Sequence, residues 1–532
     1  MDIVPAALAK EKTKKKNRKV NLSGPWVIAR KCVQYLALAV FLALFLGSRQ
    51  DGFAGDLINI PLRLDPLLVL SHLLASRTFL ASSALALIVI LITLLFGRAW
   101  CGWLCPLGTT LDLFALHRWR KNRSMPSEGW RQVKYTLLLI IVAAAVFGNL
   151  TLLFLDPLTI LLRTLTVSLW PAANQVISTV ETTLYQVPVL ADPVSNFDAW
   201  FRPMIMPLQP AYYRDAVLFA GLFVGLISLD LFASRFWCRY LCPLGGFLGL
   251  LSKVSLFRRR LTQECKGCTL CTSLCPTGTI DPAKGYASDP GECTMCLECL
   301  DTCPRGLTTF SPKFSFAGWN EYDPNRRQAL LSIGTAVAAV ALFRGDIFAK
   351  REPPTLLRPP GVLDINPDAV AFTQCTRCSE CIRVCPTNGL QPSVFDAGVE
   401  GLGSPVLLPR IGYCDYSCSA CGQVCPVGAI PKLSLDDKRL QIIGKAFIDE
   451  NRCLAWSDHV PCIVCEEMCP LPEKAVQLEE AEVWGPDGTQ VKLQLPHVLR
   501  DLCIGCGICE YKCPVDSDAA IRIYNAHSSG QV

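Results

Sequence analysis

Histidine and charged residues are scarce in this sequence. Only five of the 532 residues are histidine, and Asp, Glu, Lys and Arg together account for 18%. A b-type membrane cytochrome needs histidine ligands within its helices. Only His72 lies near an apolar run long enough for such a helix, and His117 falls in a basic loop. We therefore expect no haem.

Motifs for nucleotide chemistry are absent as well. There is no G-x-G-x-x-G fingerprint and no Walker A motif, and no set of side chains is arranged for general acid–base catalysis. We therefore predict no nucleotide cofactor. Nucleic-acid binding is not expected either, because the basic cluster near the N-terminus adjoins an apolar run, as in a membrane protein.

Apolar residues are abundant and are concentrated in four runs. Hydrophobic residues make up 51% of the chain. The runs cover residues 32–47, 79–97, 135–155 and 216–232. Their lengths suit a hydrocarbon core of about 30 Å. We predict a four-helix membrane domain over residues 32–257.

The membrane domain contains an internal duplication. Leu-Asp-Pro-Leu occurs at residues 64–67 and 155–158, and each copy precedes an apolar run. Arg-x-Trp-Cys-x-x-Leu-Cys-Pro-Leu-Gly then follows at residues 98–108 and 235–245. Two spans in each half make a parallel repeat about an axis along the membrane normal. This symmetry should bring together the cysteines of the two C-x3-C-P motifs, which are Cys101, Cys105, Cys238 and Cys242.

Positive charge predicts the orientation of these spans. The tail 1–31 is rich in lysine, and no small-residue cleavage site follows the first apolar run, so we expect a cytoplasmic tail and an uncleaved anchor. Basic residues also follow the second and fourth runs. The C-x3-C-P motifs and the segment 258–312 are therefore expected on the cytoplasmic side.

Cysteine is the most informative residue type. Of 29 cysteines, 24 form six quartets, four form the C-x3-C-P motifs, and Cys32 is left over. Four quartets follow C-x2-C-x2-C-x3-C-P, the ligand run for 4Fe–4S clusters in bacterial ferredoxins. Structural zinc usually takes two ligand pairs separated by a longer loop, so zinc is a poorer match. We predict six 4Fe–4S clusters, or about 24 iron atoms per chain.

Two of the quartets lie in the segment 258–312, which we predict to be a ferredoxin domain with two clusters. In such domains the fourth cysteine ligates the neighbouring cluster. One cluster is assigned to Cys265, Cys268, Cys271 and Cys303, and the other to Cys275, Cys293, Cys296 and Cys299.

The other four quartets lie in residues 361–532, predicted to be a four-cluster ferredoxin domain. The second and third of them are irregular at their first gap, so a lost cluster is an alternative there. Their fourth cysteines could serve an adjacent or a nested quartet. The quartets are Cys375, Cys378, Cys381 and Cys385; Cys414, Cys418, Cys421 and Cys425; Cys453, Cys462, Cys465 and Cys469; and Cys503, Cys506, Cys509 and Cys513.

A weakly hydrophobic segment, 325–347, connects the two ferredoxin regions. Its pair Arg326–Arg327 precedes a short Ala-rich run, which is typical of a twin-arginine export signal. We predict a fifth span here, then a Pro-rich linker over 348–360, which places residues 361–532 in the periplasm. The alternative is a cytosolic linker helix. The expected fold class is a membrane α-helical bundle with four helices in two parallel repeats plus a fifth span, joined to α+β ferredoxin-like multi-cluster domains.

Two families resemble the two halves of the chain. The paired C-x3-C-P motifs and the eight-cysteine segment behind them resemble NapH-type polytopic membrane ferredoxins. The last four quartets, Arg326–Arg327 and the stretch Cys469-Pro-Leu-Pro-Glu-Lys-Ala475 resemble NapG and MauM ferredoxins, which are exported and carry four clusters. The resemblance implies a NapH–NapG fusion in the bacterial cytoplasmic membrane. It also implies transfer of electrons from quinol to a periplasmic reductase or cytochrome, as in nitrate reduction.

The sequence leaves two functions and several roles open. A quinol dehydrogenase component is the first hypothesis. The second is an assembly factor that reduces a metal or a disulfide in a client oxidoreductase. The C-x3-C-P cysteines are candidates for a redox dithiol, for ligands of an additional metal centre, or for structural thiols. Asp65, Asp156 and His72 are candidates for the quinol site by position alone.

Overall fold

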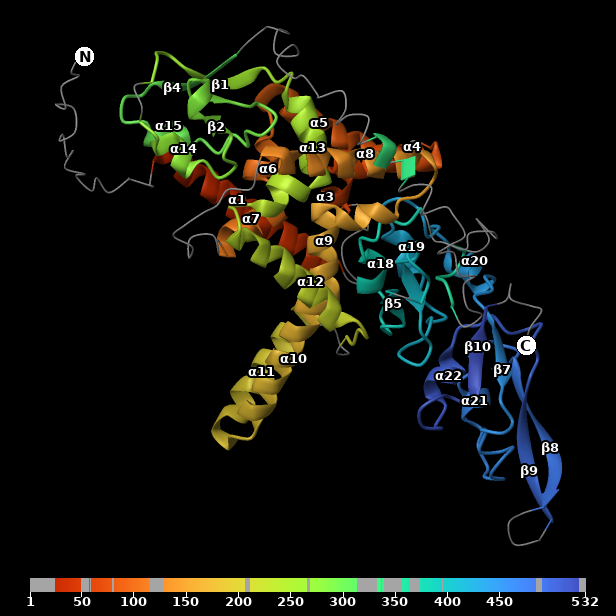
Figure 1. Ribbon diagram of the computed structural model, residues 1–532. Helices are drawn as coiled ribbons and strands as arrows, with labels where there is room; N and C mark the ends of the chain where they lie inside the picture. Colours follow the sequence, from red (N-terminus) through yellow and green to blue (C-terminus); the bar gives the residue numbers. More distant parts are fainter. Residues whose placement is uncertain are drawn as a thin grey trace, which may run out of the picture.

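The computed structural model describes most of the chain. The described residues are 24–48, 57, 59–78, 81–114, 128–205, 211–265, 268–312, 333–335, 337–338, 356–362, 374–394, 396–484 and 490–525. A helical bundle occupies the middle of the molecule, and a small ferredoxin domain lies at each end (Figure 1).

The bundle is built from two halves whose elements follow a similar order, apart from two additional helices in the second half. Its first half contains α1 (Pro25–Gly47), α3 (Ile60–Arg63), α4 (Pro66–Ser76), η1 (Ala81–Leu85), α5 (Ala86–Phe96), α6 (Ala99–Trp103) and α7 (Pro106–Phe114). The second contains α8 (Gln132–Val146), η4 (Thr151–Leu155), α9 (Pro157–Thr164), η5 (Leu165–Leu169), α10 (Trp170–Tyr185), α11 (Pro188–Ile205), α12 (Ala216–Ser228), η7 (Trp237–Leu241) and α13 (Pro243–Ser252). The predicted duplication is thus visible in the order of the elements.

The repeated Leu-Asp-Pro-Leu sequence starts a helix in each half. Asp65 caps α4 by accepting hydrogen bonds from the amides of Leu67 and Leu68, at 2.8 and 3.1 Å. Asp156 caps α9 in the same way. The proline that follows each aspartate occupies the first helical turn, where its missing N–H costs nothing.

The four predicted apolar runs correspond to α1, α5, α8 and α12, with corrected boundaries. Helix α1 begins at Pro25, inside the predicted tail, because Gly24 and Pro25 make a favourable helix start. Helix α8 ends at Val146 rather than 155, because Gly148 adopts φ +82°. Among the described residues, two helices, Pro25–Gly47 and Gly129–Val146, are long and apolar enough to cross a membrane, and the other apolar helices are shorter.

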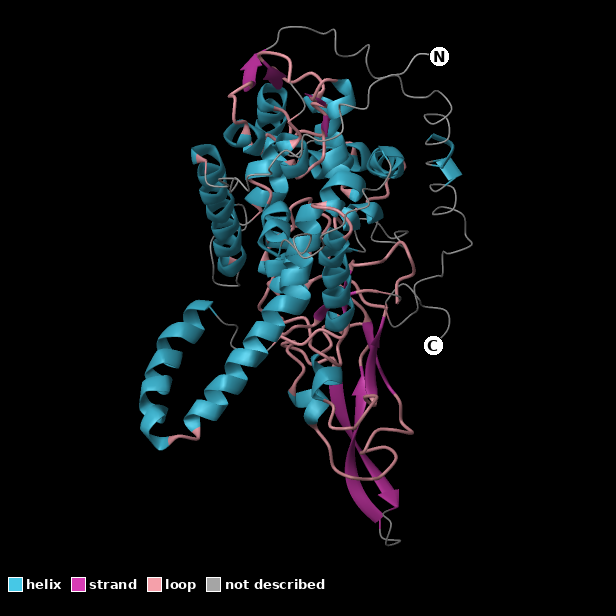
Figure 2. Cartoon of the chain, turned by 60° about the vertical axis from the view of Figure 1, so that its left-hand side comes forward, coloured by secondary structure: helices cyan, strands magenta, loops and turns pink. Residues whose placement is uncertain are grey.

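The second half contains a helical hairpin that has no counterpart in the first half. Helices α10 and α11 pack against each other and project from the bundle (Figures 1 and 2). Arg202 on α11 pairs with Glu181 on α10, and Tyr185 donates to Asp198 at 2.9 Å. The hairpin leaves large side chains exposed, including Trp200 and Val189.

The strands form two-stranded antiparallel sheets, as in bacterial ferredoxins. In the first ferredoxin domain, β1 (Phe257–Leu261) pairs with β4 (Thr308–Pro312) and β2 (Ile280–Asp281) pairs with β3 (Ala287–Ser288). In the C-terminal domain the pairs are β5 (Leu390–Pro392) with β6 (Pro405–Leu407), β7 (Lys445–Ile448) with β10 (Ile521–Tyr524), and β8 (Val476–Trp484) with β9 (Gln490–Val498). Short helices carry the cysteines between them: α14 (Leu270–Leu274), α15 (Glu298–Thr302), α18 (Glu380–Arg383), α19 (Ala420–Gln423), α21 (Val464–Glu467) and α22 (Ile508–Lys512).

The two ferredoxin domains contact opposite ends of α1. At the start of the helix, Arg30 pairs with Glu298 at 2.7 Å. At its end, Ser48 donates to Glu380 at 2.8 Å. The 23 residues of α1 span about 34 Å at 1.5 Å per residue. The domains are therefore separated by roughly the length of this helix.

The predicted fifth span lies almost entirely outside the described residues. Only residues 333–335 and 337–338 of the segment 325–347 are described, and they are helical and exposed. Arg326–Arg327 and most of the 348–360 linker are not among the described residues. The C-terminal domain begins in the structure at Leu356.

Candidate iron–sulfur centres and the four-thiol site

Five cavities in the ferredoxin domains are each lined by four cysteines. In every case three cysteines come from one quartet and the fourth comes from its neighbour. The sets are Cys275, Cys293, Cys296 and Cys299; Cys375, Cys378, Cys381 and Cys425; Cys385, Cys414, Cys418 and Cys421; Cys453, Cys462, Cys465 and Cys513; and Cys469, Cys503, Cys506 and Cys509. The three-plus-one composition is the ligand rule of two-cluster ferredoxins. These residues fit 4Fe–4S clusters.

The cavities answer the pairing question that the sequence leaves open. The first C-terminal quartet exchanges its last cysteine with the second, and the third exchanges with the fourth. Pairing is therefore between adjacent quartets. The two quartets with irregular first gaps, starting at Cys414 and Cys453, line cavities of the same kind as the regular ones.

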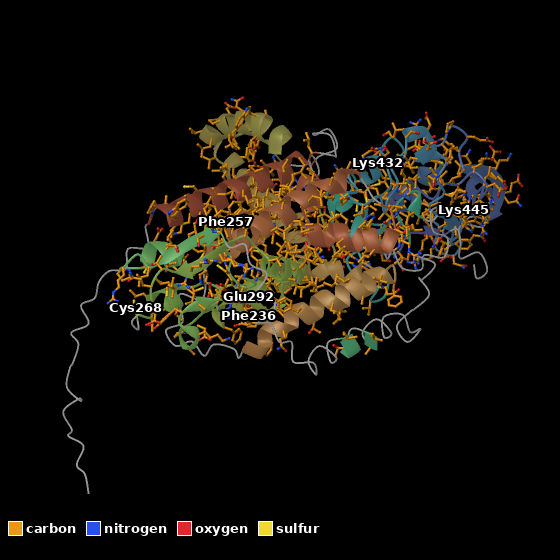
Figure 3. All side chains as sticks on the ribbon, turned by 90° about the horizontal axis from the view of Figure 1, so that it is seen from above. Phe236, Phe257, Cys268, Glu292, Lys432 and Lys445 are labelled. Carbon is orange, nitrogen blue, oxygen red and sulfur yellow. The ribbon has the colours of Figure 1, made fainter. Side chains whose placement is uncertain are left out.

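The remaining quartet, in the first ferredoxin domain, is the most exposed. Cys265 and Cys268 lie close enough to Cys271 to act on it electrostatically. Cys268 is at the outer edge of the domain (Figure 3). Cys303 accepts the amide of Leu307 at 3.3 Å. Burial alone would raise the pKa of the Cys303 thiol, but the backbone amides that face it lower this pKa.

Backbone geometry around the regular quartets is repeated and strained. Residues two and four positions after the first cysteine have positive φ in three quartets. They are Met295 and Leu297, Arg377 and Ser379, and Gly505 and Gly507. Left-handed residues curl the chain so that amides can face the sulfurs. For example, the amide of Arg377 donates to Cys375 Sγ at 3.3 Å. Spacing alone did not indicate these positions.

The structure brings the four cysteines of the C-x3-C-P motifs together. Each is less than 10% exposed. Cys105 lies close to Cys101 and Cys238, and Cys242 lies close to all three others. The second cysteine of the second motif, Cys242, accepts the amide of Gly245 at 3.2 Å, and Cys105 lies close to the equivalent Gly108. We call these four cysteines the four-thiol site.

Two arginines link the repeats across the four-thiol site. Arg98 of the first repeat donates to the carbonyl oxygen of Cys238, and Arg235 of the second donates to that of Cys101, both at 3.3 Å. Arg98 also pairs with Glu292 at 3.3 Å, and Arg235 pairs with Asp112. The arginine in each repeat thus positions the cysteine of the other.

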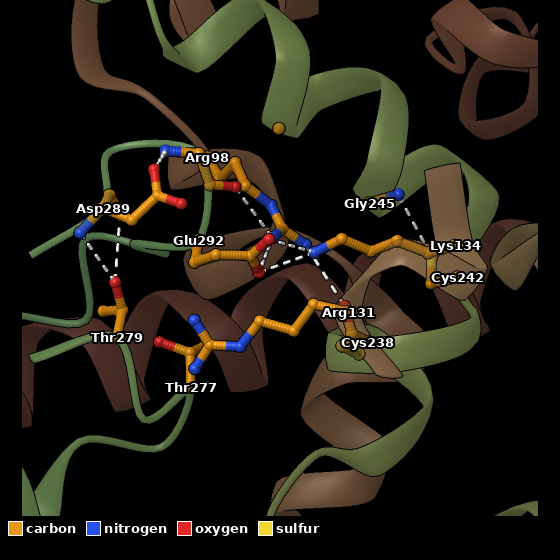
Figure 4. A network of polar contacts seen from close by, with 12 residues as sticks. Arg98, Arg131, Lys134, Cys238, Cys242, Gly245, Thr277, Thr279, Asp289 and Glu292 are labelled. Atoms are coloured by element: carbon orange, nitrogen blue, oxygen red, sulfur yellow. Dashed lines mark hydrogen bonds and ion pairs between the residues drawn. The ribbon is translucent and has the colours of Figure 1, made fainter. Parts of the chain in front are cut away.

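Glu292 connects the bundle to the first ferredoxin domain (Figure 4). Lys134 Nζ lies 2.6 Å from both carboxylate oxygens, and Tyr135 donates to one of them at 3.1 Å. Burial would raise the pKa of Glu292, but Lys134 and Arg98 outweigh it and lower that pKa. The carboxylate is therefore ionised and sits inside the molecule, directly before the ligand residue Cys293 (Figure 3).

The four-thiol site lies directly against one cluster cavity. Trp103, within the first motif, donates its indole N–H to the carbonyl oxygen of Met295 at 2.8 Å. A Cβ on Gly102 would lie 2.1 Å from the carbonyl oxygen of Thr294. Both partners belong to the loop that carries Cys293 and Cys296. Only a few residues therefore separate the motif from the cavity of Cys275, Cys293, Cys296 and Cys299.

At the opposite end of the bundle, another cluster cavity packs on the helices. Cys378 and Val427 belong to the same apolar core as the bundle residues Leu153 and Leu158. Arg163, on α9, is buried close to Cys378. The cavity of Cys375, Cys378, Cys381 and Cys425 is therefore the C-terminal one nearest the bundle.

The three candidates for a quinol site lie at this same end. Asp65 and Asp156 are fully buried, and their carboxyl groups lie close to each other. His72, on α4, is also buried and lies close to the backbone of Val427 in the C-terminal domain. The sequence indicated these residues by position alone and did not indicate the carboxyl pair.

Family models match both repeats and the C-terminal domain. A model described as a 4Fe-4S binding domain matches residues 78–124, 216–262 and 421–438, and a second model with the same description matches 496–517. The first two segments contain the two C-x3-C-P motifs. No solved structure matches the chain.

Several curated ferredoxin-type proteins are similar to part of the chain. MauM, a methylamine utilization ferredoxin-type protein of Methylorubrum extorquens, is 30% identical over 209 residues, which are 38% of this chain and 89% of MauM. NapG of Escherichia coli is 34% identical over 167 residues, 31% of this chain and 68% of NapG. NapG of Haemophilus influenzae is 34% identical over 169 residues, 31% of this chain and 58% of that protein.

The ferredoxin domains and their cysteine-lined cavities define an iron–sulfur electron-transfer protein. Over the part that these relatives cover, the chain belongs to the family of ferredoxin-type proteins MauM and NapG. The predicted resemblance to NapG and MauM is therefore confirmed. The resemblance of the helical half to NapH, and hence the fusion, stays a prediction.

Proposed function

We propose that the chain is a quinol dehydrogenase component of the bacterial cytoplasmic membrane. It takes electrons from the quinone pool and passes them through six 4Fe–4S clusters to a periplasmic reductase or cytochrome. One observation carries this proposal: ferredoxin domains lie at both ends of an apolar bundle, and a cluster cavity packs directly on the bundle at each end.

The membrane topology forms part of the same proposal. The tail and the domain 258–312 are cytoplasmic, and residues 361–532 are periplasmic. The segment 325–347 is the span that carries the chain across between them. This arrangement is supported by the contacts of the two domains with opposite ends of α1. The proposed acceptor belongs to a nitrate reductase-like system, as the resemblance to NapG-type ferredoxins implies.

The four-thiol site is proposed as the point at which quinol electrons reach the cytoplasmic pair of clusters. Its contact with the loop of Cys293 and Cys296 supports this role. The test is reduction of the clusters by a short-chain quinol in purified membranes. The loss of visible absorbance measures this reduction. The Cys105→Ser/Cys242→Ser variant should lose this reduction at the cytoplasmic clusters, while dithionite still reduces them.

Cys32→Ser is the matched control, because Cys32 is exposed and belongs to no motif. Quinol reduction at the parental rate in the double variant would overturn the proposed role. The second function, an assembly factor that reduces a metal or disulfide in a client, predicts no quinol reduction. It also predicts that the chain is needed only in substoichiometric amounts relative to its client.

A further inference from the structure

We propose that the four-thiol site holds a seventh iron–sulfur cluster, shared between the two repeats. The segments 78–124 and 216–262 each match a 4Fe-4S binding domain, yet each contains only two cysteines. Neither segment alone can supply the four thiolates of a cubane. The fold brings both pairs into one buried cluster, with Arg98 and Arg235 each contacting the first cysteine of the other repeat, so that Cys101, Cys105, Cys238 and Cys242 together offer four thiols.

Backbone amides contact cysteine sulfurs in this site, as they do in the ferredoxin cavities. Gly245 donates its amide to Cys242 Sγ at 3.2 Å, and the equivalent Gly108 lies close to Cys105. In the cluster cavities, Cys375 and Cys425 accept amides at 3.3 and 3.4 Å. Amide hydrogen bonds to sulfur are one of the means by which proteins tune iron–sulfur clusters.

Hydrogen-bond donors around the four thiols lack acceptors. Trp100 and Trp237 directly precede the first cysteine of each motif, and both are more than nine-tenths buried. Their indole N–H groups have no acceptor among the described residues, nor does Arg98 Nε. An unpaired buried donor costs about 1–3 kcal/mol. The four cysteine sulfurs do not accept from these donors, and the inorganic sulfides of a cluster would add acceptors for the two equivalent tryptophans.

Two buried arginines lie close to the four thiols. Arg98 is near Cys101 and Cys242, and Arg235 is near Cys238. Positive charge beside the site favours an anionic group there. Four thiolates around a core of charge +2 carry a net charge of −2, whereas four neutral thiols carry none.

The redox step at such a cluster is a simple one. The oxidised core accepts one electron. That electron then passes to the cubane of Cys275, Cys293, Cys296 and Cys299, and the core returns to its oxidised state. No bond to a ligand breaks and no proton is needed. The identity of quinol as the donor rests on the proposed function, but occupancy of the site does not.

Iron and acid-labile sulfide in the full-length protein, purified without oxygen, test the proposal. We expect more than the roughly 24 iron atoms that six cubanes supply. Cys105→Ser/Cys242→Ser should remove two iron atoms for a 2Fe–2S core or four for a 4Fe–4S core. It should also remove one electron paramagnetic resonance signal from the dithionite-reduced protein. Cys32→Ser should change neither quantity.

The measurement separates the alternatives without using quinol. Equal iron in the parent and the double variant would overturn the proposal, as would zinc released in place of iron. If the double variant does not accumulate, the parental protein alone still tests the proposal. About 24 iron atoms in the parental protein, together with four further thiols that can be alkylated after unfolding, would exclude the additional cluster. A bound cluster without quinol reduction would instead count against the proposed function.

Trp100→Phe and Trp237→Phe provide a gentler test. Each variant keeps an aromatic ring at the position but removes the unpaired indole N–H. We expect the iron content to stay at the parental level while the reduction potential of the additional signal falls, because a donor to the cluster sulfurs has been lost. An unchanged potential in both variants would contradict the assignment of these donors to a cluster.

Discussion

Asp65 and Asp156 occupy the same position in the two repeats, and their carboxyl groups lie close together in the interior. Each caps a helix with one oxygen, and the other oxygen of each has no partner among the described residues. Two buried carboxylates this close cannot both ionise, so we expect one of the pair to hold a proton. That proton would allow one carboxyl group to donate to the other and so join the two repeats.

The carboxyl groups of this pair have two roles, capping a helix and contacting each other, and replacing one of them separates the two roles. Asp156→Asn retains the capping oxygen, and its amide can donate to Asp65 in place of the shared proton. Asp156→Ala loses the cap, at about 1 kcal/mol, and also leaves Asp65 without its buried partner. We expect a clearly larger fall in the melting temperature of the detergent-solubilised protein for the alanine variant. Equal falls would mean that the pair is not held by a proton.

Glu292→Gln should loosen the first ferredoxin domain from the bundle. The substitution leaves Lys134 and Arg98 buried without their carboxylate, and breaking a buried ion pair costs about 3–5 kcal/mol. Limited proteolysis should then release the 258–312 domain at a lower temperature than in the parent. Asp436→Asn is the control, because its pair with Arg439 is exposed, and exposed pairs contribute at most about 1 kcal/mol. Equal proteolysis of both variants would contradict this account.

Gly102→Ala should disturb the contact between the four-thiol site and the neighbouring cluster. The new Cβ would lie 2.1 Å from the carbonyl oxygen of Thr294, so the loop that carries Cys293 and Cys296 must move. We expect slower reduction by quinol of the cluster proposed for Cys275, Cys293, Cys296 and Cys299, with the iron content unchanged. Gly221→Ala, on α12, is the control, because nothing lies within 4 Å of a Cβ there. Equal rates in the two variants would show that this contact does not limit electron transfer.

Reporter fusions test the predicted sidedness of the two ferredoxin domains. A reporter placed after Pro304 should be active only in the cytoplasm, and one placed after Pro360 only in the periplasm. The basis is the distribution of basic residues and the contacts of the two domains with opposite ends of α1. Fusions that report the same side would contradict the fifth span and would place all six predicted clusters in one compartment.

The parts of the fold that follow from local sequence could be predicted. Cysteine spacing indicated the ferredoxin domains, and the repeated motifs indicated the duplication of the bundle. The exchange of Cys385 and Cys425 between adjacent quartets could not be read from spacing, because nested pairing satisfies the same ligand rule. The crossed arginines Arg98 and Arg235 were also missed, since each contacts a cysteine more than a hundred residues away in sequence. Such contacts depend on packing between repeats.

The C-terminal domain packs against helices from the start of the chain, and these contacts affect the order in which the protein folds. Ser48 and Glu380 are separated by 332 residues in sequence, and Phe45 and Arg383 by 338. Contacts over such separations form late, because a long loop must close first. Until residues near Cys378 and Val427 are synthesised and in place, the apolar surface that they cover on the bundle has no partner. A chain that stops after the first ferredoxin domain would therefore expose that surface, and cells should degrade it faster than the complete protein.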